Sequence, residues 1–435
     1  MATSTVVVLG AGFGGLTLAR SLKGAPVRVV LIDRNDFHLF SPLLYQVASS
    51  MLDPSDIAQP VRRLLRGVPN CDFMQADVEG VDLEGKRVRT NRGALPYDTL
   101  VVATGSATNF FGNRSVTDHS YPLKELSDAM ALRNRILGQF EQAEWEPDPQ
   151  ARRKLLSVVV TGGGPTGVEF TGAVSELIDL VVRKDLKRIR REEIAVHLLE
   201  GGDRLLPAFD PKLSAAAFRS LEKKGVKIRL NALVEGVEGD QVSLRGGEQV
   251  TAGTLVWTAG VRGVIAPGGL PSNERASNQI PVTDRLQVEG HPEVFVIGDV
   301  GGHPDDLPML SPVAMQGAKY VAQAIRAGGP RARFEYHDPG TMATIGRGSG
   351  VAQLGRLRFS GVLGWAMWLA VHLLKIMTFR ARLFVLVKWA WDYTFIDRPI
   401  RIAVRAGAGP RDAPADQVLR AEEATPVEAS PKPVR

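Results

Sequence analysis

The sequence predicts an α/β protein with two Rossmann-like dinucleotide-binding domains and a C-terminal region of different character. Three observations lead to this prediction. A glycine-rich turn after an apolar strand occurs twice, an acidic residue ends the next strand each time, and the C-terminal part is rich in tryptophan and basic residues. At 435 residues, of which 44% are hydrophobic and 23% charged, the chain has room for roughly two to three globular domains.

The first half of the chain is echoed in the second. The segment TVVVLGAGFGGLTLARSL, which contains Gly10, is repeated as SVVVTGGGPTGVEFTGAV, which contains Gly162. Farther on, LVVATGS with Gly105 is repeated as LVWTAGV with Gly260. Each copy reads as a strand, a glycine turn, an apolar-periodic helix and a second strand, which together form a βαβ unit. We therefore expect two similar domains.

The first glycine turn has the spacing of a dinucleotide-binding fingerprint. Gly10, Gly12 and Gly15 follow the strand VVVL and precede the helix LTLARSL, with Gly14 in the same turn. Glycines at this spacing permit a tight turn and let a pyrophosphate approach the N-terminus of the helix. Asp33 ends the next strand, VRVVLID, where a carboxylate accepts hydrogen bonds from ribose hydroxyls.

The second turn repeats this arrangement. Gly162, Gly164 and Gly167 follow SVVVT, and Glu200 ends the strand AVHLLE. A carboxylate at this position binds a free 2′-hydroxyl and repels a 2′-phosphate, which favours NAD(H) over NADP(H). Arg204, four residues farther on, weakens this preference.

The next segment is expected to return to the first domain. HPEVFVIGDVGG is a short apolar strand that ends in Gly298 and Asp299, and the helix-like PVAMQGAKYVAQAIRAG follows it. From about Phe334 the chain reads as strands, TMATIGRG and GVAQLGRLRF, and then as two aromatic, basic and apolar stretches. From Ala406 onward alanine, proline and charged residues dominate, which predicts a disordered tail.

The aromatic stretches suggest a membrane surface. Residues 339–391 contain no acidic residue and several basic ones, and tryptophan beside arginine is typical of a membrane interface. The apolar run is interrupted by His372 and Lys375, so a spanning helix is not expected. We expect a chain truncated near Arg358 to be soluble and still to bind NADH. The alternative is that these helices belong to the core or to a dimer interface. The tryptophans concerned are Trp365, Trp368, Trp389 and Trp391.

The single cysteine, Cys71, excludes an internal disulfide and any redox-active pair of thiols. Electron transfer must therefore rely on a cofactor. The N-terminal residues lead directly into a strand without a basic segment, so we expect no secretory signal. We therefore expect the protein to reside in a reducing cytoplasm.

The order of these motifs resembles the two-dinucleotide-binding flavoprotein reductases over residues 1 to about 330. The segments DRNDFHLFSPLLYQVA, GGGPTGVEFTGAVSEL, LLEGGDRLLPAF and PVAMQGAKYVA, with the C-terminal stretches, further resemble the type II NADH dehydrogenases, which are single-subunit NADH:quinone oxidoreductases. The resemblance implies FAD at the first fingerprint and NADH at the second. It also implies that Thr104 and Gly105 close the FAD site and that Asp299 binds the ribityl or pyrophosphate part of FAD.

The resemblance further implies hydride transfer from NADH to the flavin and then transfer of two electrons to a membrane quinone, without proton pumping. Glu169 is implied to lie where nicotinamide meets flavin and to couple proton uptake to quinone reduction. The family carries two glutamines four residues apart on a late helix; the second matches Gln316, but Pro312 replaces the first. Because proline donates no hydrogen bond, Tyr45 and Gln46 become further candidates for quinone binding.

These motifs predict the following division of the chain. Residues 1–115 form the first part of the FAD-binding domain, 116–274 the NAD(H)-binding domain, 275–335 the second part of the FAD-binding domain, 336–405 a membrane-associating domain and 406–435 a disordered tail.

The expected partners are a membrane quinone, either menaquinone or ubiquinone, and the bilayer surface on the cytoplasmic side of the cell membrane, with the chain as a peripheral homodimer. No metal and no nucleic acid are expected. Two alternatives stay open: a soluble NADH-dependent flavoprotein reductase with a protein acceptor, which Pro312 favours, and a slow redox-sensing flavoprotein.

Overall fold

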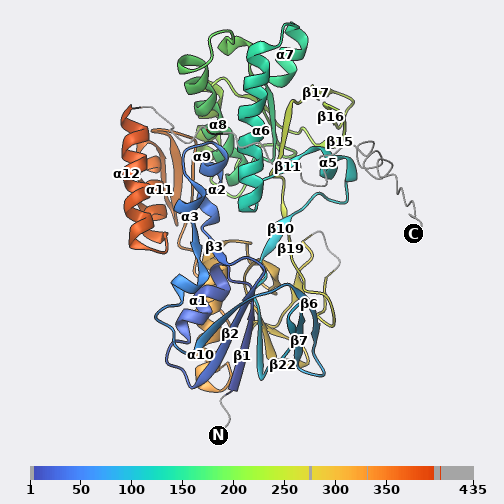
Figure 1. The fold of residues 1–435 in the computed structure, drawn as a ribbon, viewed down its shortest axis with the longest axis vertical. Helices are drawn as coiled ribbons and strands as arrows, with labels where there is room; N and C mark the ends of the chain where they lie inside the picture. The colour runs from blue at the N-terminus through green and yellow to red at the C-terminus, as the bar shows by residue number, and fades with distance from the viewer. Residues whose placement is uncertain (1–3, 274–276, 331, 396–401, 403–435) are drawn as a thin grey trace, which may run out of the picture.

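Two parallel sheets organise the computed structural model, which describes residues 4–273, 277–330, 332–395 and 402 (Figure 1). The first sheet has six strands in the order β21-β22-β9-β1-β2-β5, and β21 pairs antiparallel at its edge. Apolar β-branched residues fill the central strands because both faces of this sheet are covered. The strands are β1 (Ser4–Leu9), β2 (Val27–Asp33), β5 (Cys71–Gln75), β9 (Thr99–Val102), β21 (Gln287–Val288) and β22 (His291–Val296).

Two helices cover one face of the first sheet. Helices α1 (Phe13–Ser21) and α10 (Ser311–Ala327) pack against each other, although they are far apart in the sequence (Figure 1). A small antiparallel sheet lies on the other side (Figure 1). It consists of β6 (Val78–Asp82), β7 (Arg87–Thr90) and β8 (Gly93–Pro96).

The second sheet has five parallel strands in the order β11-β18-β12-β13-β14. The predicted α/β class with two parallel sheets is therefore confirmed. The strands are β11 (Tyr121–Pro122), β12 (Ser157–Thr161), β13 (Ala195–Leu199), β14 (Lys227–Arg229) and β18 (Thr254–Trp257). Its helices are α5 (Arg114–His119), α6 (Leu126–Trp145), α7 (Pro149–Leu155), α8 (Pro165–Lys184) and α9 (Pro211–Lys223), with the 3-10 turn η2 (Arg191–Glu193) and the small sheet β15 (Val234–Glu238), β16 (Gln241–Leu244) and β17 (Gln249–Thr251).

Short strands connect the two parts. β10 (Ser106–Thr108) and β19 (Val261–Gly263) run antiparallel where the chain crosses between the sheets (Figure 1). β20 (Ile280–Pro281) pairs with β23 (Gly301–Gly302), and the 3-10 turn η3 (Gly298–Val300) lies beside the start of α10. The predicted boundary at 274/275 and the predicted tail 406–435 lie outside the described residues.

An excursion from the first sheet reaches the helices of the second. Helix α2 (Leu44–Ala48) packs against α6 and α8, so residues close to the N-terminus join the hydrophobic core of the second half. The same excursion contains β3 (Phe37–Leu39), η1 (Ser41–Leu43), α3 (Pro54–Ile57), β4 (Ala58–Pro60) and α4 (Val61–Leu64).

The C-terminal part is a three-stranded sheet followed by two helices. α11 (Val362–Lys375) packs on that sheet, and α12 (Phe379–Phe395) packs on α11 and α3 (Figure 1). Trp368 and Trp389 are 0% and 3% exposed and belong to the core of the second half, so a membrane-interface role is wrong for these two tryptophans. Truncation near Arg358 would remove part of this core. The strands are β24 (Thr341–Thr344), β25 (Gly350–Leu354) and β26 (Leu357–Gly361).

Candidate active site

The first glycine turn lies between β1 and α1 and has the geometry of a nucleotide cradle. Gly10 has φ +101°, and a Cβ atom there would collide with the carbonyl oxygen of Ala103. A Cβ atom at Gly15 would collide with the carbonyl oxygen of Gly10. At Gly12, by contrast, a Cβ atom would meet nothing within 4 Å. The fold therefore requires glycine at two positions, and the third leaves open space at the N-terminus of α1, where a pyrophosphate fits.

The second turn, between β12 and α8, repeats this geometry. Gly162 has φ +107°, and a Cβ atom there would lie 2.8 Å from the backbone nitrogen of Ala259. A Cβ atom at Gly167 would collide with the carbonyl oxygen of Gly162, and Gly164 again has nothing within 4 Å. The two turns are thus alike in this respect as well: in each, two glycines are required by the fold and the third leaves open space.

The two acidic residues occupy matching places beside these turns. Asp33 accepts hydrogen bonds from the backbone nitrogens of Ala11 at 2.6 Å and Asn35 at 2.8 Å. Burial raises the pKa of Asp33, while these backbone hydrogen bonds act in the opposite direction. Glu200 accepts from the backbone nitrogens of Gly163 at 2.5 Å and Gly202 at 2.6 Å. Each carboxylate is therefore held against its own glycine turn.

Arg204 lies in the loop after Glu200. Its Nη2 donates to the carbonyl oxygen of Pro207 at 3.0 Å. The guanidinium therefore stabilises its own loop in this structure.

Asp299 lies in η3, where the end of β22 meets α10. Its Oδ2 accepts from the Ser106 hydroxyl at 2.5 Å and lies 3.7 Å from Nζ of Lys124, which itself donates to Ser106 at 2.7 Å. Thr104 donates to the carbonyl oxygen of Val264 at 2.5 Å, one residue before Gly105 with φ +70°. Ser106 of β10 and Lys124 thus both contact the carboxylate of Asp299.

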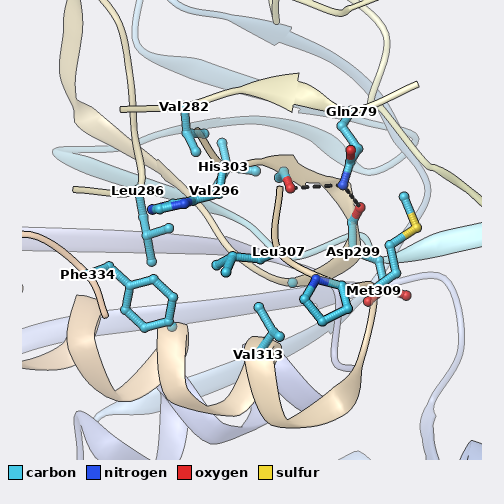
Figure 2. A pocket seen from close by; sticks show the side chains of 14 residues that line it. Gln279, Val282, Leu286, Val296, Asp299, His303, Leu307, Met309, Val313 and Phe334 are labelled. Carbon is cyan, nitrogen blue, oxygen red and sulfur yellow. Dashed lines mark hydrogen bonds between the residues drawn. The ribbon is translucent and has the colours of Figure 1, made fainter. Parts of the chain in front are cut away.

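A small cavity lies behind Asp299 (Figure 2). Gln279 donates through Nε2 to the carbonyl oxygens of Asp299 at 3.1 Å and Gly301 at 3.0 Å, and so fixes the backbone that carries the carboxylate (Figure 2). His303 and Phe334 line the same cavity. Sequence reasoning missed Gln279 and Lys124, because no spacing in the sequence links them to Asp299.

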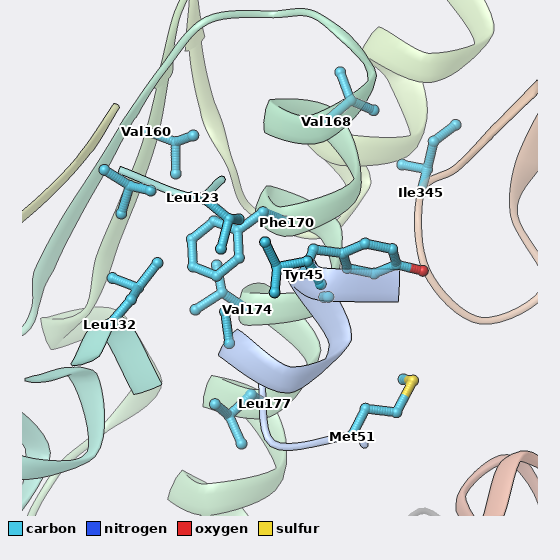
Figure 3. Packing of buried hydrophobic residues seen from close by; sticks show 14 of the residues in the cluster. Tyr45, Met51, Leu123, Leu132, Val160, Val168, Phe170, Val174, Leu177 and Ile345 are labelled. Carbon is cyan, nitrogen blue, oxygen red and sulfur yellow. The ribbon is translucent and has the colours of Figure 1, made fainter. Parts of the chain in front are cut away.

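Tyr45 and Gln46 lie on α2 and are buried against the second half of the molecule. Figure 3 shows Tyr45 in the same buried cluster as Phe170 of α8, with its oxygen directed toward the segment that carries Ile345. Nε2 of Gln46 donates to the Tyr45 hydroxyl at 2.8 Å, and Oε1 of Gln46 accepts from the indole of Trp389 at 2.8 Å.

Glu169 lies in the first turns of α8 and is 8% exposed. Its Oε1 accepts from the indole nitrogen of Trp368 at 2.9 Å and from the backbone nitrogen of Thr344 at 3.2 Å. Burial raises the pKa of Glu169 to about 8, and the two hydrogen bonds lower it. The carboxyl group is therefore largely protonated at neutral pH, and it can release or take up a proton at a pH close to neutral. Sequence reasoning did not connect Trp368, Trp389 or Thr344 with this region.

Gln316 lies on α10 and is engaged with the backbone. Its Nε2 donates to the carbonyl oxygen of His337 at 2.8 Å, and its Oε1 accepts from the nitrogen of the same residue at 3.0 Å. Pro312 is in the first turn of α10, where a missing N–H costs nothing. Among the described residues, no hydrogen bond joins Gln316 to Tyr45, Gln46 or Glu169.

Comparison with known proteins identifies the family. The model for the pyridine nucleotide-disulphide oxidoreductases matches residues 4–318. The type II NADH:quinone oxidoreductase Ndh of Mycobacterium tuberculosis is 37% identical, with 88% of this chain and 87% of that protein covered. NdhA of the same organism, also a type II NADH:quinone oxidoreductase, is 38% identical, with 90% and 87% covered. The chain belongs to the type II NADH:quinone oxidoreductases.

Solved structures agree with this membership at the level of the fold. The structure of NDH2 from Plasmodium falciparum in complex with NADH matches with a TM-score of 0.85 and 20% identity, over 92% of this chain and all of that one. A ferredoxin reductase from Rhodopseudomonas palustris matches with a TM-score of 0.65 and 20% identity, over 81% and 82%. As a type II NADH:quinone oxidoreductase, the chain thus shares the fold of this solved structure over most of its length, whereas the family model ends at residue 318.

Proposed function

We propose that this chain oxidises NADH and reduces a quinone, with FAD at the first glycine turn and NADH at the second. The observation that carries the proposal is the pair of turns with open space at Gly12 and Gly164, in a chain 37–38% identical to type II NADH:quinone oxidoreductases over most of its length. Bound FAD would supply the redox chemistry, which is hydride uptake from NADH and delivery of two electrons to the quinone, without proton pumping.

The protein's own residues bind and orient the cofactors. Asp33 binds the adenosine ribose of FAD, and Asp299 binds its ribityl or pyrophosphate part, supported by Gln279 from behind. Thr104 and Gly105 close the site beside the crossing segments. Glu200 binds the ribose of NADH and disfavours the 2′-phosphate of NADPH.

Glu169 is the proposed proton donor to the quinone. Its raised pKa, about 8, leaves it protonated at neutral pH, and its position on α8 lies between α2 and the C-terminal sheet. Tyr45 and Gln46 orient the quinone. Gln316 stays a candidate for quinone binding by its place in the sequence motif, although both ends of its amide are engaged with the backbone of His337 in this structure.

The surface of α11 and α12 supports the proposal of docking to the cytoplasmic side of a membrane. Apolar side chains between 48% and 79% exposed cluster there, and basic side chains of the same helices lie among them. No helix in the described ranges combines the length and apolarity needed to cross a bilayer. An apolar face flanked by basic residues suits the anionic surface of a membrane, with a homodimer as the competing use of this face. The most exposed are Val362, Leu363, Leu374, Phe379, Val387 and Phe395.

Anaerobic mixing with NADH tests the proposed function. The purified protein is expected to be yellow, to bleach on addition of NADH and to recover its colour on addition of menadione. Ferredoxin as the alternative acceptor separates quinone reduction from the protein-acceptor alternative that Pro312 and the engaged Gln316 keep open. A protein that bleaches with NADH and recovers only with ferredoxin would disprove quinone reduction.

A further inference from the structure

Two tryptophans of the C-terminal helices reach the polar side chains proposed to serve the quinone. Trp368 of α11 donates to Oε1 of Glu169 at 2.9 Å, and Trp389 of α12 donates to Oε1 of Gln46 at 2.8 Å. The two indole rings lie 5.9 Å apart, and the ring of Trp368 packs edge-on against Tyr45 at 6.1 Å. The helices that carry the exposed apolar face therefore also touch the buried polar groups directly.

Trp389 determines the direction of a chain of hydrogen bonds. An indole N–H only donates, so the oxygen of the Gln46 amide must face Trp389 and its nitrogen must face Tyr45. The phenol oxygen of Tyr45 then accepts from Gln46, which leaves the phenol hydrogen for another acceptor. Within the described part of the chain, Tyr45 donates no hydrogen bond. A carbonyl oxygen of a quinone is the acceptor that this arrangement suits.

Trp368 acts on Glu169 in a different way. Its N–H and that of Thr344 stabilise the ionised carboxylate and oppose the effect of burial. His372 stacks on Trp368 at 4.1 Å, and burial lowers its pKa to about 4, so it carries no charge at neutral pH.

The other titratable groups near Glu169 and Tyr45 lie on α2, α8 and α12 and directly after α9. Tyr45 faces it from α2, and burial raises the pKa of that phenol well above its usual value. Glu176, farther along α8, is paired with Lys224 at 2.7 Å, and Tyr393 of α12 acts on Tyr45. None of these groups donates a hydrogen bond to the carboxylate of Glu169 in place of Trp368.

We propose that Trp368 and Trp389 are positioning residues for quinone reduction, through which α11 and α12 set the hydrogen bonding of Glu169 and of the Tyr45–Gln46 pair. This inference rests on the proposed function and deepens it. The substrate class is a quinone whose carbonyl oxygen accepts from Tyr45. The same two helices, α11 and α12, therefore carry both the exposed apolar face proposed to dock to the membrane and the two buried indoles.

The test uses the full-length, FAD-containing protein and single ring-preserving substitutions. Trp368→Phe and Trp389→Phe each remove an indole N–H and keep an aromatic ring. Trp365→Phe is the matched control, because Trp365 packs edge-on against Tyr393 at 5.0 Å and its Nε1 has no partner among the described residues. Two steps are measured separately: bleaching of the flavin by NADH, and its reoxidation by menadione.

Trp389→Phe is expected to raise the KM for menadione about tenfold, the equivalent of one hydrogen bond, and to leave bleaching by NADH as in the control. Gln46→Glu keeps the size of the side chain but turns it into an acceptor only, so Tyr45 donates to it and no longer to the quinone. The same rise in KM is expected for Gln46→Glu, which separates the direction of hydrogen bonding from packing.

Trp368→Phe is expected to move the high-pH limit of reoxidation, which lies near the pKa of about 8, upward by about one pH unit. The pH dependence of the melting temperature is expected to move in the same direction, which is a readout independent of turnover.

Two results would overturn the inference while the proposed function stands. One is that both tryptophan variants behave as Trp365→Phe does; the other is that bleaching and reoxidation fall in parallel, which indicates a general structural role. A wild-type protein that bleaches with NADH but is not reoxidised by menadione would overturn the proposed function, and the inference with it.

Discussion

The glycines of the two turns differ in what the structure requires of them. Gly10 has a backbone conformation and a close neighbour that exclude a side chain, whereas Gly12 has neither constraint. The sequence pattern treats them alike. The structure separates a glycine that the fold requires from one that keeps space for a ligand, and this difference is measurable.

Gly12→Ala is expected to fold with a loss of at most about 1 kcal/mol in the free energy of unfolding, as for an N-cap change, but to bind little FAD. Gly10→Ala is expected to lose about 1–3 kcal/mol from backbone strain alone, and more from the collision with Ala103. Urea denaturation and the flavin absorbance per protein check both. Equal flavin content in Gly12→Ala and wild type would contradict the assignment of this turn.

The same reasoning applies to the second turn. Gly164→Ala is expected to keep the yellow colour and the stability of the wild type while the KM for NADH rises at least about tenfold, since a methyl group fills the space meant for the pyrophosphate. Steady-state kinetics with a fixed acceptor measures this. A loss of FAD instead would indicate that the two sites are exchanged.

Glu169→Gln has an expected effect on stability and on rate. The folded protein keeps the proton of Glu169 up to a pKa of about 8, whereas the ordinary value is 4.5, so the free energy of unfolding falls as pH rises between these values. The substitution is expected to flatten that dependence and to slow reoxidation by quinone about a hundredfold, the lower end for a general acid. Melting temperatures across this pH range, together with stopped-flow reoxidation, test both; an unchanged slope would show that Glu169 is not the group that titrates.

At the scale of elements, α11 and α12 have two different faces. Trp368 and Trp389 point inward and join the core with Ile376 and Val385, and Lys388 pairs with the buried Asp56 of α3. The outer faces carry exposed apolar side chains. These helices therefore belong to the folded core as well as to a surface, and removing them is a poor test of membrane binding.

Substitutions on the outer face are a better test. Leu383→Glu combined with Phe384→Glu, at positions 48% and 49% exposed, is expected to reduce cosedimentation with anionic vesicles at least about tenfold and to leave NADH–menadione turnover unchanged. Trp145→Glu on α6, 69% exposed, is the control for an added acidic residue elsewhere. If the double variant still cosediments but is monomeric where the wild type is dimeric, this face is a subunit interface instead.

At the scale of the whole molecule, the site is assembled from distant segments. The proposed FAD site combines the turn after β1 with Asp299 from η3, and the proposed quinone side combines α2, α8 and the C-terminal helices. Binding of FAD is expected to stabilise the folded state by about 3 kcal/mol at a hundredfold excess over Kd. Calorimetry of FAD-depleted protein, with and without added FAD, measures this gain.

Local patterns in the sequence were sufficient for the fold class, the family and both glycine turns with their acids. Strand, turn, helix and terminal acid are neighbours in the chain, so their spacing already contains the geometry of a nucleotide cradle. The structure bears this out in the equivalent backbone of Gly10 and Gly162. The roles of the site residues stay predictions for the experiments above.

What the sequence determined by itself was the two nucleotide-binding units, because each is built from contiguous residues. Only the tertiary structure decided which tryptophans face inward, that Gln316 is held by His337, and that Glu169 lies against Trp368. Trp368 and Trp391 occur in similar apolar and basic surroundings in the chain, yet one is fully buried and the other 53% exposed. The physical reason is that burial and hydrogen bonding depend on which elements pack together, and residues hundreds of positions apart carry no local mark of their contact.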